Sequence, residues 1–186
     1  MSNQLTFVSR GGLKLEHALQ AFNLVVTNFT VLDVGCSTGG FVDCLLQYGA
    51  TRVYALDTAY GELSWKLRQD PRVKVMERTN VLRLTDLPES VDLITIDASW
   101  TKLSLILPIV KKFLKPKGQI IALLKPHYEA DKKSLIKGVL PVEIAEQVKE
   151  QVKVQIEDLN LMIEKETPSP ILGGGGNTEY LWLIQQ

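Results

Sequence analysis

The chain has 186 residues, a length that suits one compact domain with a sizeable core. Its content of 45% hydrophobic and 23% charged residues is ordinary for a globular protein and excludes a disordered or fibrous one. Twenty-one basic residues balance twenty-one acidic residues, so attraction to nucleic acid or to a membrane cannot come from net charge.

The sequence also gives expectations for compartment and domain organisation. It has no recognisable leader peptide and no apolar run near the roughly 20 residues that cross a bilayer. Cys36 and Cys44 fit neither a metal knuckle nor a redox pair, so we expect two free thiols and no metal site. We therefore predict a cytoplasmic protein with one domain over residues 1–186, in which residues 1–29 form a helical segment packed on the rest.

Short β-rich runs alternate with stretches of helical periodicity along most of the chain. After a short amphipathic helix at 13–22, the predicted strands are 30–34, 52–57, 73–76, 91–97 and 118–125, and the predicted helices are 40–49, 61–69, 102–114 and 142–153. Strands that are apolar at consecutive positions are buried on both faces, as in a parallel sheet covered by helices. This pattern predicts an α/β, doubly wound, Rossmann-like fold.

The last part of the chain differs, because strands at 158–166 and 178–184 follow each other without a helix between them. We expect these two strands to pair antiparallel. The four glycines at 173–176 are interpreted as a turn, since a phosphate cradle would begin a helix and these glycines precede a strand.

Residues 31–41, VLDVGCSTGGF, have the features of a ligand-binding turn between a strand and a helix. The buried strand contains Asp33, and Gly35, Gly39 and Gly40 allow the backbone to approach a ligand closely. In open α/β sheets, ligands bind at this carboxyl edge of the strands. The GxxxGG spacing argues against both a dinucleotide fingerprint and a phosphate-binding P-loop.

The ends of the next two strands favour a nucleoside as the ligand. Asp57 follows the second strand about twenty residues after the glycine turn, where a carboxylate can accept both ribose hydroxyls. Asn80 follows the third strand, and its amide could bind an adenine edge or could simply be a turn residue.

Two charged residues end the fourth and fifth strands at the same edge. Asp97 could take part in chemistry there or could cap the helix that follows it. Lys125 lies in the apolar run IIALLKP, and a buried lysine requires a charged partner or a function.

Six stretches, found in order over nearly the whole chain, carry a family resemblance. They are VSRGGLKLEHAL (8–19), VLDVGCSTGGFVDCLLQYGA (31–50), DPRVKVMERTN (70–80), IDAS (96–99), LLKPHYEA (123–130) and SPILGGGGNTEYLW (169–182). The chain resembles the TlyA/FtsJ-type ribosomal RNA 2′-O-ribose methyltransferases, some of which are named haemolysins. The resemblance implies S-adenosylmethionine as cofactor and a class I methyltransferase sheet of seven mostly parallel strands with an antiparallel last strand.

The family's site residues can be carried over by motif. Its Lys-Asp-Lys-Glu tetrad falls on Lys14, Asp97, Lys125 and Glu179. The glycine turn and the resemblance together give the expected cofactor-binding residues Asp33, Gly35, Ser37, Thr38, Gly39, Gly40, Phe41, Asp57, Asn80 and Asp97. We expect Lys125 to be the base, with a pKa lowered by burial and by Lys14, while Asp97 and Glu179 orient the ammonium groups and oppose part of that shift.

Departures from the family pattern bear on the RNA substrate. Family members carry a small RNA-binding domain before SRGG, and only MSNQLTFV precedes that motif here, whether by trimming or by nature. We therefore expect weak affinity of this chain for ribosomal RNA or a ribosomal subunit, with phosphate contacts from Arg10 and from one basic face over the lysine-rich region 111–137. The family's KPQFE and SFISL stand here as KPHYE and SWTKL, both beside the predicted crevice.

Several alternatives stay open at this point. His127 could be a second base, although a hydrogen-bonding surface role is more common for a histidine in a turn. Trp100 and Tyr128 could stack on a base or ribose or could be packing residues. The rival functions are methylation of another substrate, cofactor binding without catalysis, and membrane lysis, which would require an amphipathic or spanning segment that the sequence does not present. The oligomeric state is not predicted.

Overall fold

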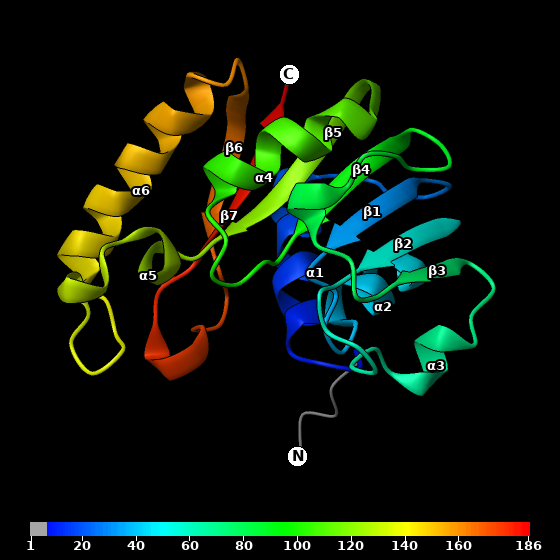
Figure 1. The fold of residues 1–186 in the computed structure, drawn as a ribbon, viewed down its shortest axis with the longest axis horizontal. Helices are drawn as coiled ribbons and strands as arrows, with labels where there is room; N and C mark the ends of the chain where they lie inside the picture. Colours follow the sequence, from blue (N-terminus) through cyan, green and yellow to red (C-terminus); the bar gives the residue numbers. More distant parts are fainter. Residues whose placement is uncertain (1–6) are drawn as a thin grey trace.

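The computed structural model describes residues 7–186, so the first six residues of the predicted segment 1–29 lie outside the described residues. Seven strands form one sheet in the order β3-β2-β1-β4-β5-β7-β6, with helices on both faces (Figure 1). Strands β1 to β5 are parallel, whereas β7 is antiparallel to both β5 and β6. The predicted doubly wound α/β fold and the antiparallel pairing at the end of the chain are confirmed.

The elements follow the predicted order. The strands are β1 (Thr30–Val34), β2 (Arg52–Leu56), β3 (Val73–Met76), β4 (Val91–Ile96), β5 (Leu114–Leu124), β6 (Met162–Pro168) and β7 (Tyr180–Gln185). The helices are α1 (Gly11–Phe22), α2 (Gly40–Gln47), α3 (Trp65–Arg68), α4 (Leu103–Val110), α5 (Pro126–Glu129) and α6 (Val142–Glu157), with 3₁₀ turns η1 (Val81–Arg83), η2 (Lys111–Phe113), η3 (Lys132–Ser134) and η4 (Gly174–Gly176).

Among the boundaries that differ from the sequence prediction, two have a clear physical reason. Helix α3 is shorter than the predicted 61–69, because Gly61 at φ 80° and Ser64 at ψ 145° have backbone conformations that are not helical. Strand β6 starts four residues later than predicted, because α6 continues to Glu157 and a turn with Asn160 at φ 54° follows it.

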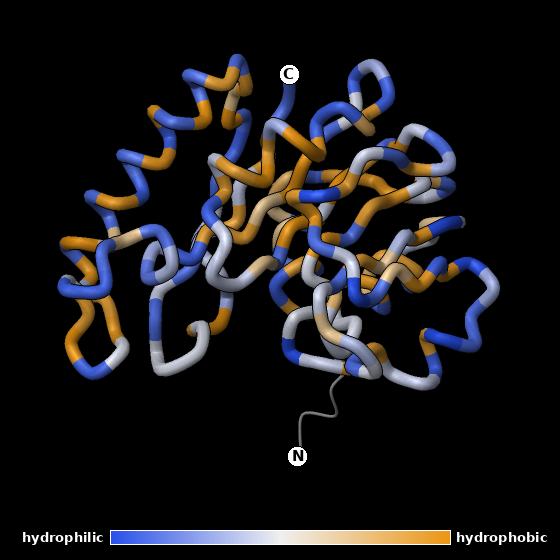
Figure 2. Tube along the Cα trace, in the orientation of Figure 1, coloured by the Kyte–Doolittle hydropathy of each residue, from blue (hydrophilic) through white to orange (hydrophobic). Residues whose placement is uncertain are grey.

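Each face of the sheet has its own apolar core, because neighbouring strand residues point to opposite faces. Val31 packs with α1 and α2 through residues such as Leu15 and Leu45. Leu32 packs with the α4 and α6 side, where Ile106 is fully buried. Figure 2 shows the apolar residues concentrated along the central strands. This double burial explains why the parallel strands have continuous apolar runs.

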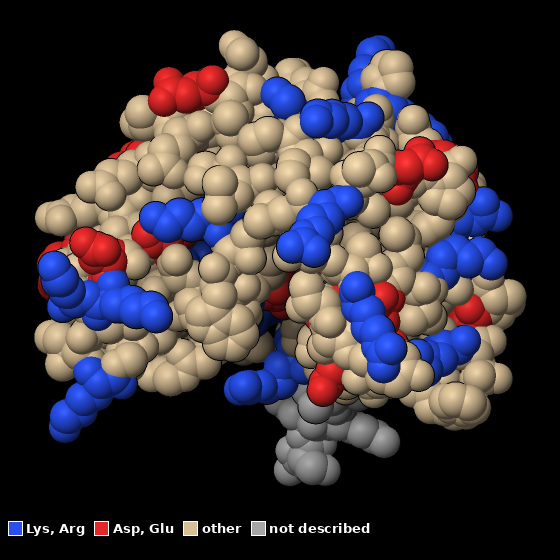
Figure 3. All heavy atoms as spheres, viewed as in Figure 1, with Lys and Arg blue, Asp and Glu red and all other residues tan. Residues whose placement is uncertain are grey.

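The lysines of the region 111–137 form two groups, one at each end of strand β5. Lys111, Lys112, Lys115 and Lys117 lie in η2 and at the start of β5, whereas Lys132, Lys133 and Lys137 follow α5. Strand β5 separates the two groups, and a strand advances about 3.3 Å per residue. Figure 3 shows basic side chains gathered over α5 and the loop after it.

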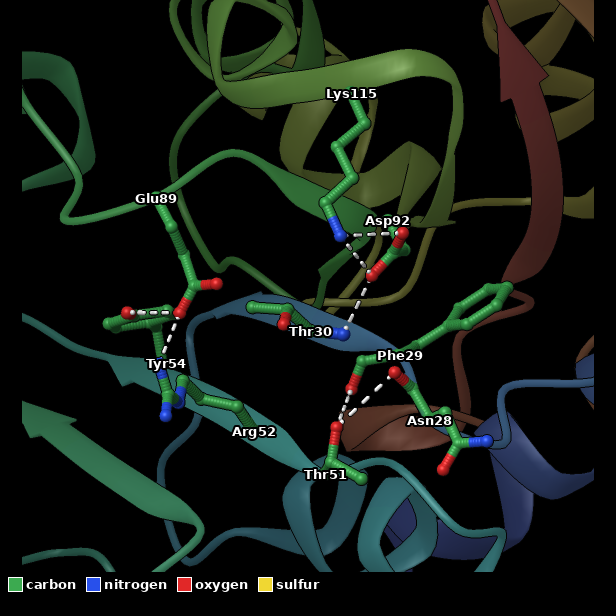
Figure 4. Close-up of polar contacts among 9 residues, drawn as sticks. All are labelled: Asn28, Phe29, Thr30, Thr51, Arg52, Tyr54, Glu89, Asp92 and Lys115. Carbon is green, nitrogen blue, oxygen red and sulfur yellow. Dashed lines mark hydrogen bonds and ion pairs between the residues drawn. The ribbon is translucent and has the colours of Figure 1, made fainter.

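The amino edge of the sheet is closed by polar contacts between strands (Figure 4). Lys115 Nζ lies 2.9 Å from Asp92, whose carboxylate also accepts from the N–H of Thr30. Glu89 accepts from Arg52 at 2.5 Å and from the Tyr54 hydroxyl at 3.0 Å. Arg52 is thus paired with Glu89, and Lys115 with Asp92, at this edge.

Across residues 7–186, no helix combines the length and the apolar content that a bilayer crossing requires.

Candidate functional site

The turn after β1 is built so that two loops meet at the carboxyl edge of the sheet. Gly35 has φ +86°, and a Cβ there would lie 2.7 Å from the carbonyl oxygen of Asp97. A side chain at this position would therefore meet both backbone strain and a steric clash. The N–H groups of Gly35 and Cys36 both donate to Leu56 O, which ties the turn to the end of β2.

The segment before α1 packs directly on this turn. A Cβ at Gly40 would overlap Ser9 Oγ and would lie 2.7 Å from the N–H nitrogen of Gly12. The N–H of Val8 donates to Asp43 Oδ2 at 2.9 Å, which joins the same segment to α2. These close approaches fix the start of α1, and with it Lys14, beside the glycine turn.

Two adjoining cavities lie at this edge. The smaller, of about 260 Å³, is lined by Ser9, Arg10, Gly11, Lys14, Gly35, Cys36, Ser37, Thr38, Gly40, Phe41, Asp97 and residues 171–174. The larger, of about 550 Å³, is lined by Val34, Gly35, Ser37, Leu56, Asp57, Thr58, Ala59, Glu62, Asn80, Val81 and residues 97–101. Figure 3 shows a hollow between α1 and the segment before β7, with charged side chains inside it. Because the cavities share Gly35, Ser37 and Asp97, one elongated ligand can occupy both.

Asp57 lines the larger cavity with its carboxylate held in place. Its two oxygens accept from the N–H groups of Ser37 and Ala59, both at 2.8 Å. Each carboxylate oxygen has a second lone pair that can accept from a ligand hydroxyl. Asn80 is a turn residue, since its Oδ1 accepts from the N–H of Leu82, and it also lines this cavity.

Two of the expected cofactor-binding residues do not line either cavity. Asp33 is fully buried below the turn, where the Thr95 hydroxyl donates to it at 2.6 Å. Burial, followed by repulsion from Asp97 and Asp57, raises the pKa of Asp33 to about 7. Gly39 precedes α2 at φ +99°, and a Cβ there would overlap the side chain of Leu67. Asp33 and Gly39 therefore pack against the buried side of the glycine turn, outside the two cavities.

The four residues of the expected tetrad form two lysine–carboxylate pairs. Lys125 Nζ lies 2.6 Å from Asp97 Oδ1 and 3.3 Å from Ser99 Oγ. Lys14 Nζ lies 2.5 Å from Glu179 Oε2, although 165 residues separate them in the sequence. All four side chains are mostly buried, and Lys14 and Asp97 line the smaller cavity. Ammonium and carboxylate groups are thus concentrated beside a cavity that opens to solvent.

Burial excludes one of the two roles left open for His127. Only 8% of this residue is exposed, so the expectation of a surface residue is wrong. Burial, together with the charges of Lys125 and Lys14, lowers the pKa of His127 and favours the neutral ring.

Trp100 lines the larger cavity, and Tyr128 lies beside it. Trp100 is 79% exposed at φ +59°, and its ring centre lies 5.3 Å from that of Tyr128. A side chain this exposed is not a packing residue of the core, so that alternative is wrong for Trp100. An exposed aromatic ring beside a cavity can stack on a planar ligand.

Sequence reasoning missed the structural role of Glu129. Its Oε1 accepts from the N–H of Leu103 at 2.9 Å, and it therefore caps the start of α4 from another segment. The alternative that Asp97 caps this helix is wrong. The residue before the helix is Lys102, which cannot cap an N-terminus, and this absence of a local cap was the available signal.

Comparison with known proteins adds a family to this geometry. Residues 7–185 match the model of the FtsJ-like methyltransferases. The candidate rRNA methyltransferase YqxC of Bacillus subtilis is 44% identical over 185 residues, which are 96% of this chain and 66% of that protein. The 16S/23S rRNA (cytidine-2′-O)-methyltransferase TlyA of Mycobacterium tuberculosis is 38% identical over 191 residues, covering 99% of this chain and 70% of that protein. The chain thus spans about two thirds of the length of these relatives.

A solved structure is also similar to this chain. A protein from Streptococcus thermophilus described as a candidate hemolysin superposes with a TM-score of 0.95 at 41% identity, over 100% of this chain and 69% of that one.

Proposed function

The chain belongs to the FtsJ-like methyltransferase family, and from this membership and the site geometry we propose that it transfers a methyl group from S-adenosylmethionine to a ribose 2′-hydroxyl of ribosomal RNA. The observation that carries the proposal is the pair of buried lysine–carboxylate contacts beside the two joined cavities. The relatives named as rRNA methyltransferases support the choice of RNA as substrate.

The residues around the cavities fit S-adenosylmethionine. The joined cavities, which share Gly35, Ser37 and Asp97, suit a ligand with a nucleoside and an amino-acid part. Asp57 would hold the ribose hydroxyls, and Asn80 would lie against the base. The carboxylate of Asp97 suits a ligand that carries a positive charge. Arg10 and Ser37 line the smaller cavity, where they would bind the amino-acid part.

The bound cofactor supplies a methyl group that is already activated by its positively charged sulfur. The protein therefore has to align the ribose hydroxyl and to remove its proton. In its neutral form, Lys125 Nζ would accept the hydroxyl proton as the O–C bond forms and the methyl–sulfur bond breaks, with the sulfur leaving as a neutral thioether. Asp97, whose Oδ1 lies 2.6 Å from Lys125 Nζ, would then stabilise the resulting ammonium group as an ion pair.

The second pair would orient the ribose. Lys14 Nζ donates to Glu179 at 2.5 Å, and its remaining protons can donate to a ribose oxygen in the smaller cavity. RNA phosphates would bind Arg10 and the lysines after α5, and the exposed ring of Trp100 would stack on a base.

The test is methyl transfer from labelled S-adenosylmethionine to ribosomal subunits that lack the modification. We expect Lys125→Ala to lower kcat by a factor of about 10² to 10⁴, the usual contribution of general base catalysis, while cofactor affinity is retained. Lys115→Ala is the matched control, because it also removes a lysine–aspartate pair, at the opposite edge of the sheet. Equal activity of Lys125→Ala and the wild type would remove Lys125 from the base role.

A further inference from the structure

Two loops that are distant in sequence lie against each other beside the smaller cavity. The basic loop, residues 131–140, follows α5 and exposes Lys132, Lys133 and Lys137. The glycine loop, residues 169–178, precedes β7 and contributes residues 171–174 to the cavity lining. One buried side chain, Asn177, joins them.

Asn177 is 2% exposed and bonds to both loops at once. Its Oδ1 accepts from the N–H of Leu140 at 2.9 Å, and its Nδ2 donates to Gly138 O at 3.1 Å in the basic loop. The same Nδ2 donates to Gly174 O at 2.9 Å in the glycine loop. Its backbone carbonyl also accepts from the N–H of Gly173 at 2.9 Å. A buried amide with these bonds fixes the position of one loop relative to the other.

The glycine loop in turn touches the second lysine–carboxylate pair. Gly173 packs so closely on Glu179 that a Cβ at this position would lie 2.5 Å from the carboxylate carbon. The N–H of Ser169 donates to the carbonyl of Glu179 at 2.9 Å. Glu179 is therefore enclosed by a loop that contains four consecutive glycines, at positions 173 to 176.

A run of glycines has much conformational freedom to lose, so its position depends on its anchors. Within residues 7–186, Asn177 is the side chain whose hydrogen bonds join this loop to the basic loop. We propose that Asn177 is a positioning residue that couples the basic loop to Glu179, so that RNA phosphates docked on Lys132, Lys133 and Lys137 hold Glu179 against Lys14. This inference rests on the proposed function and deepens it, because it links substrate docking to the geometry of the reacting site.

The test is a double-mutant cycle on the full chain, with kcat and KM for ribosomal subunits measured separately. One arm replaces Lys132, Lys133 and Lys137 by alanine, the other is Asn177→Ala, and a third variant combines them. Replacement of Lys74, Lys112 and Lys117 by alanine is the control, since it removes the same charge from exposed lysines elsewhere. Unfolding midpoints are measured first, and assays are run below all of them.

In the Asn177-containing protein, we expect loss of the three lysines to raise KM about ten-fold through lost phosphate contacts. We also expect it to lower kcat about five-fold, within the range of coupling between linked sites. In the Asn177→Ala background, the same lysine replacements should raise KM alone, because kcat has already fallen. Equal kcat losses in both backgrounds, or no kcat loss in either, would overturn the coupling.

Two further results keep the proposal separate from its premise. Asn177→Asp keeps the acceptor for the Leu140 N–H and loses both Nδ2 donors, so it should uncouple kcat like alanine and serves if Asn177→Ala does not fold. If the wild type transfers no methyl group to either ribosomal subunit, the proposed function fails. If it does and the cycle is additive, only the coupling fails.

Discussion

Replacement of Gly173 by alanine tests whether the position of Glu179 matters for methyl transfer. Gly173 has φ −71° and ψ −172°, which alanine adopts without strain, so the effect of the substitution is steric. A Cβ would lie 2.5 Å from Glu179 Cδ, whereas ordinary contacts begin at 3.4 Å. The carboxylate must therefore withdraw by about 1 Å, a misplacement that can cost about 10²-fold in rate.

The withdrawal would disturb the 2.5 Å contact between Lys14 and Glu179. A 10²-fold loss corresponds to about 2.7 kcal/mol in the barrier. Single-turnover methyl transfer is the assay, with cofactor binding measured by calorimetry on the same samples.

Gly174→Ala is the matched control, because a Cβ there meets nothing within 4 Å. Because Glu179 is not displaced in this variant, it should react faster than Gly173→Ala, although Gly174 also lines the smaller cavity. A Gly173→Ala protein that is folded, binds cofactor and reacts as fast as the wild type would refute a role for the position of Glu179.

The remaining predictions concern stability and substrate binding. Burial raises the pKa of Asp33 from 3.8 to about 7 in the folded state. Between these pH values the unfolded state releases the proton and the folded state keeps it, so the free energy of unfolding falls by up to about 4 kcal/mol as pH rises. Asp33→Asn should abolish that slope in denaturant titrations, and an unchanged slope would contradict the buried carboxyl. Glu129→Ala should cost about 1 kcal/mol by uncapping α4, with Glu129→Gln close to wild type in the same titrations. Trp100→Ala should raise KM for RNA roughly 5- to 150-fold, which corresponds to a stacking contribution of about 1–3 kcal/mol. Trp100→Phe should restore most of the lost affinity. Equal KM values for Trp100→Ala and the wild type would exclude stacking.

The fold could be predicted from local pattern wherever burial sets the residue types. Strand β1 has the bounds that its apolar run predicted, because both faces of the sheet are covered there. The edge strand β3 also has its predicted bounds, although Lys74 and Val75 are exposed. Helix α3 is shorter than its periodicity indicated, since Gly61 at φ 80° and Ser64 at ψ 145° are not helical. The N–H groups of this loop bond to Glu77 from a later segment, and such a contact is not encoded in local periodicity.

The site residues also fall into those that local sequence pattern predicted and those that it did not. Asp57, Asp97 and Lys125 were predictable from their places at strand ends, where parallel strands bring side chains to one edge. Lys14 and Glu179 came only from the family resemblance, because no spacing rule joins residues 165 positions apart. The contacts of Glu129 and Asn177 depend on loops that fold against each other. The absence of a local cap before α4 indicated a distant partner without identifying Glu129, and nothing in the sequence pattern pointed to Asn177.

The most direct test of the account is the chemical position of the transferred methyl group. Ribosomal RNA methylated by the wild type would be digested to nucleosides, and alkaline hydrolysis would be run on a parallel sample. A 2′-O-methyl group blocks the attack of the 2′-oxygen on the neighbouring phosphate, so the account predicts a ribose-methylated nucleoside and an alkali-resistant dinucleotide. A methyl group on a base, with every phosphodiester still cleaved by alkali, would contradict it.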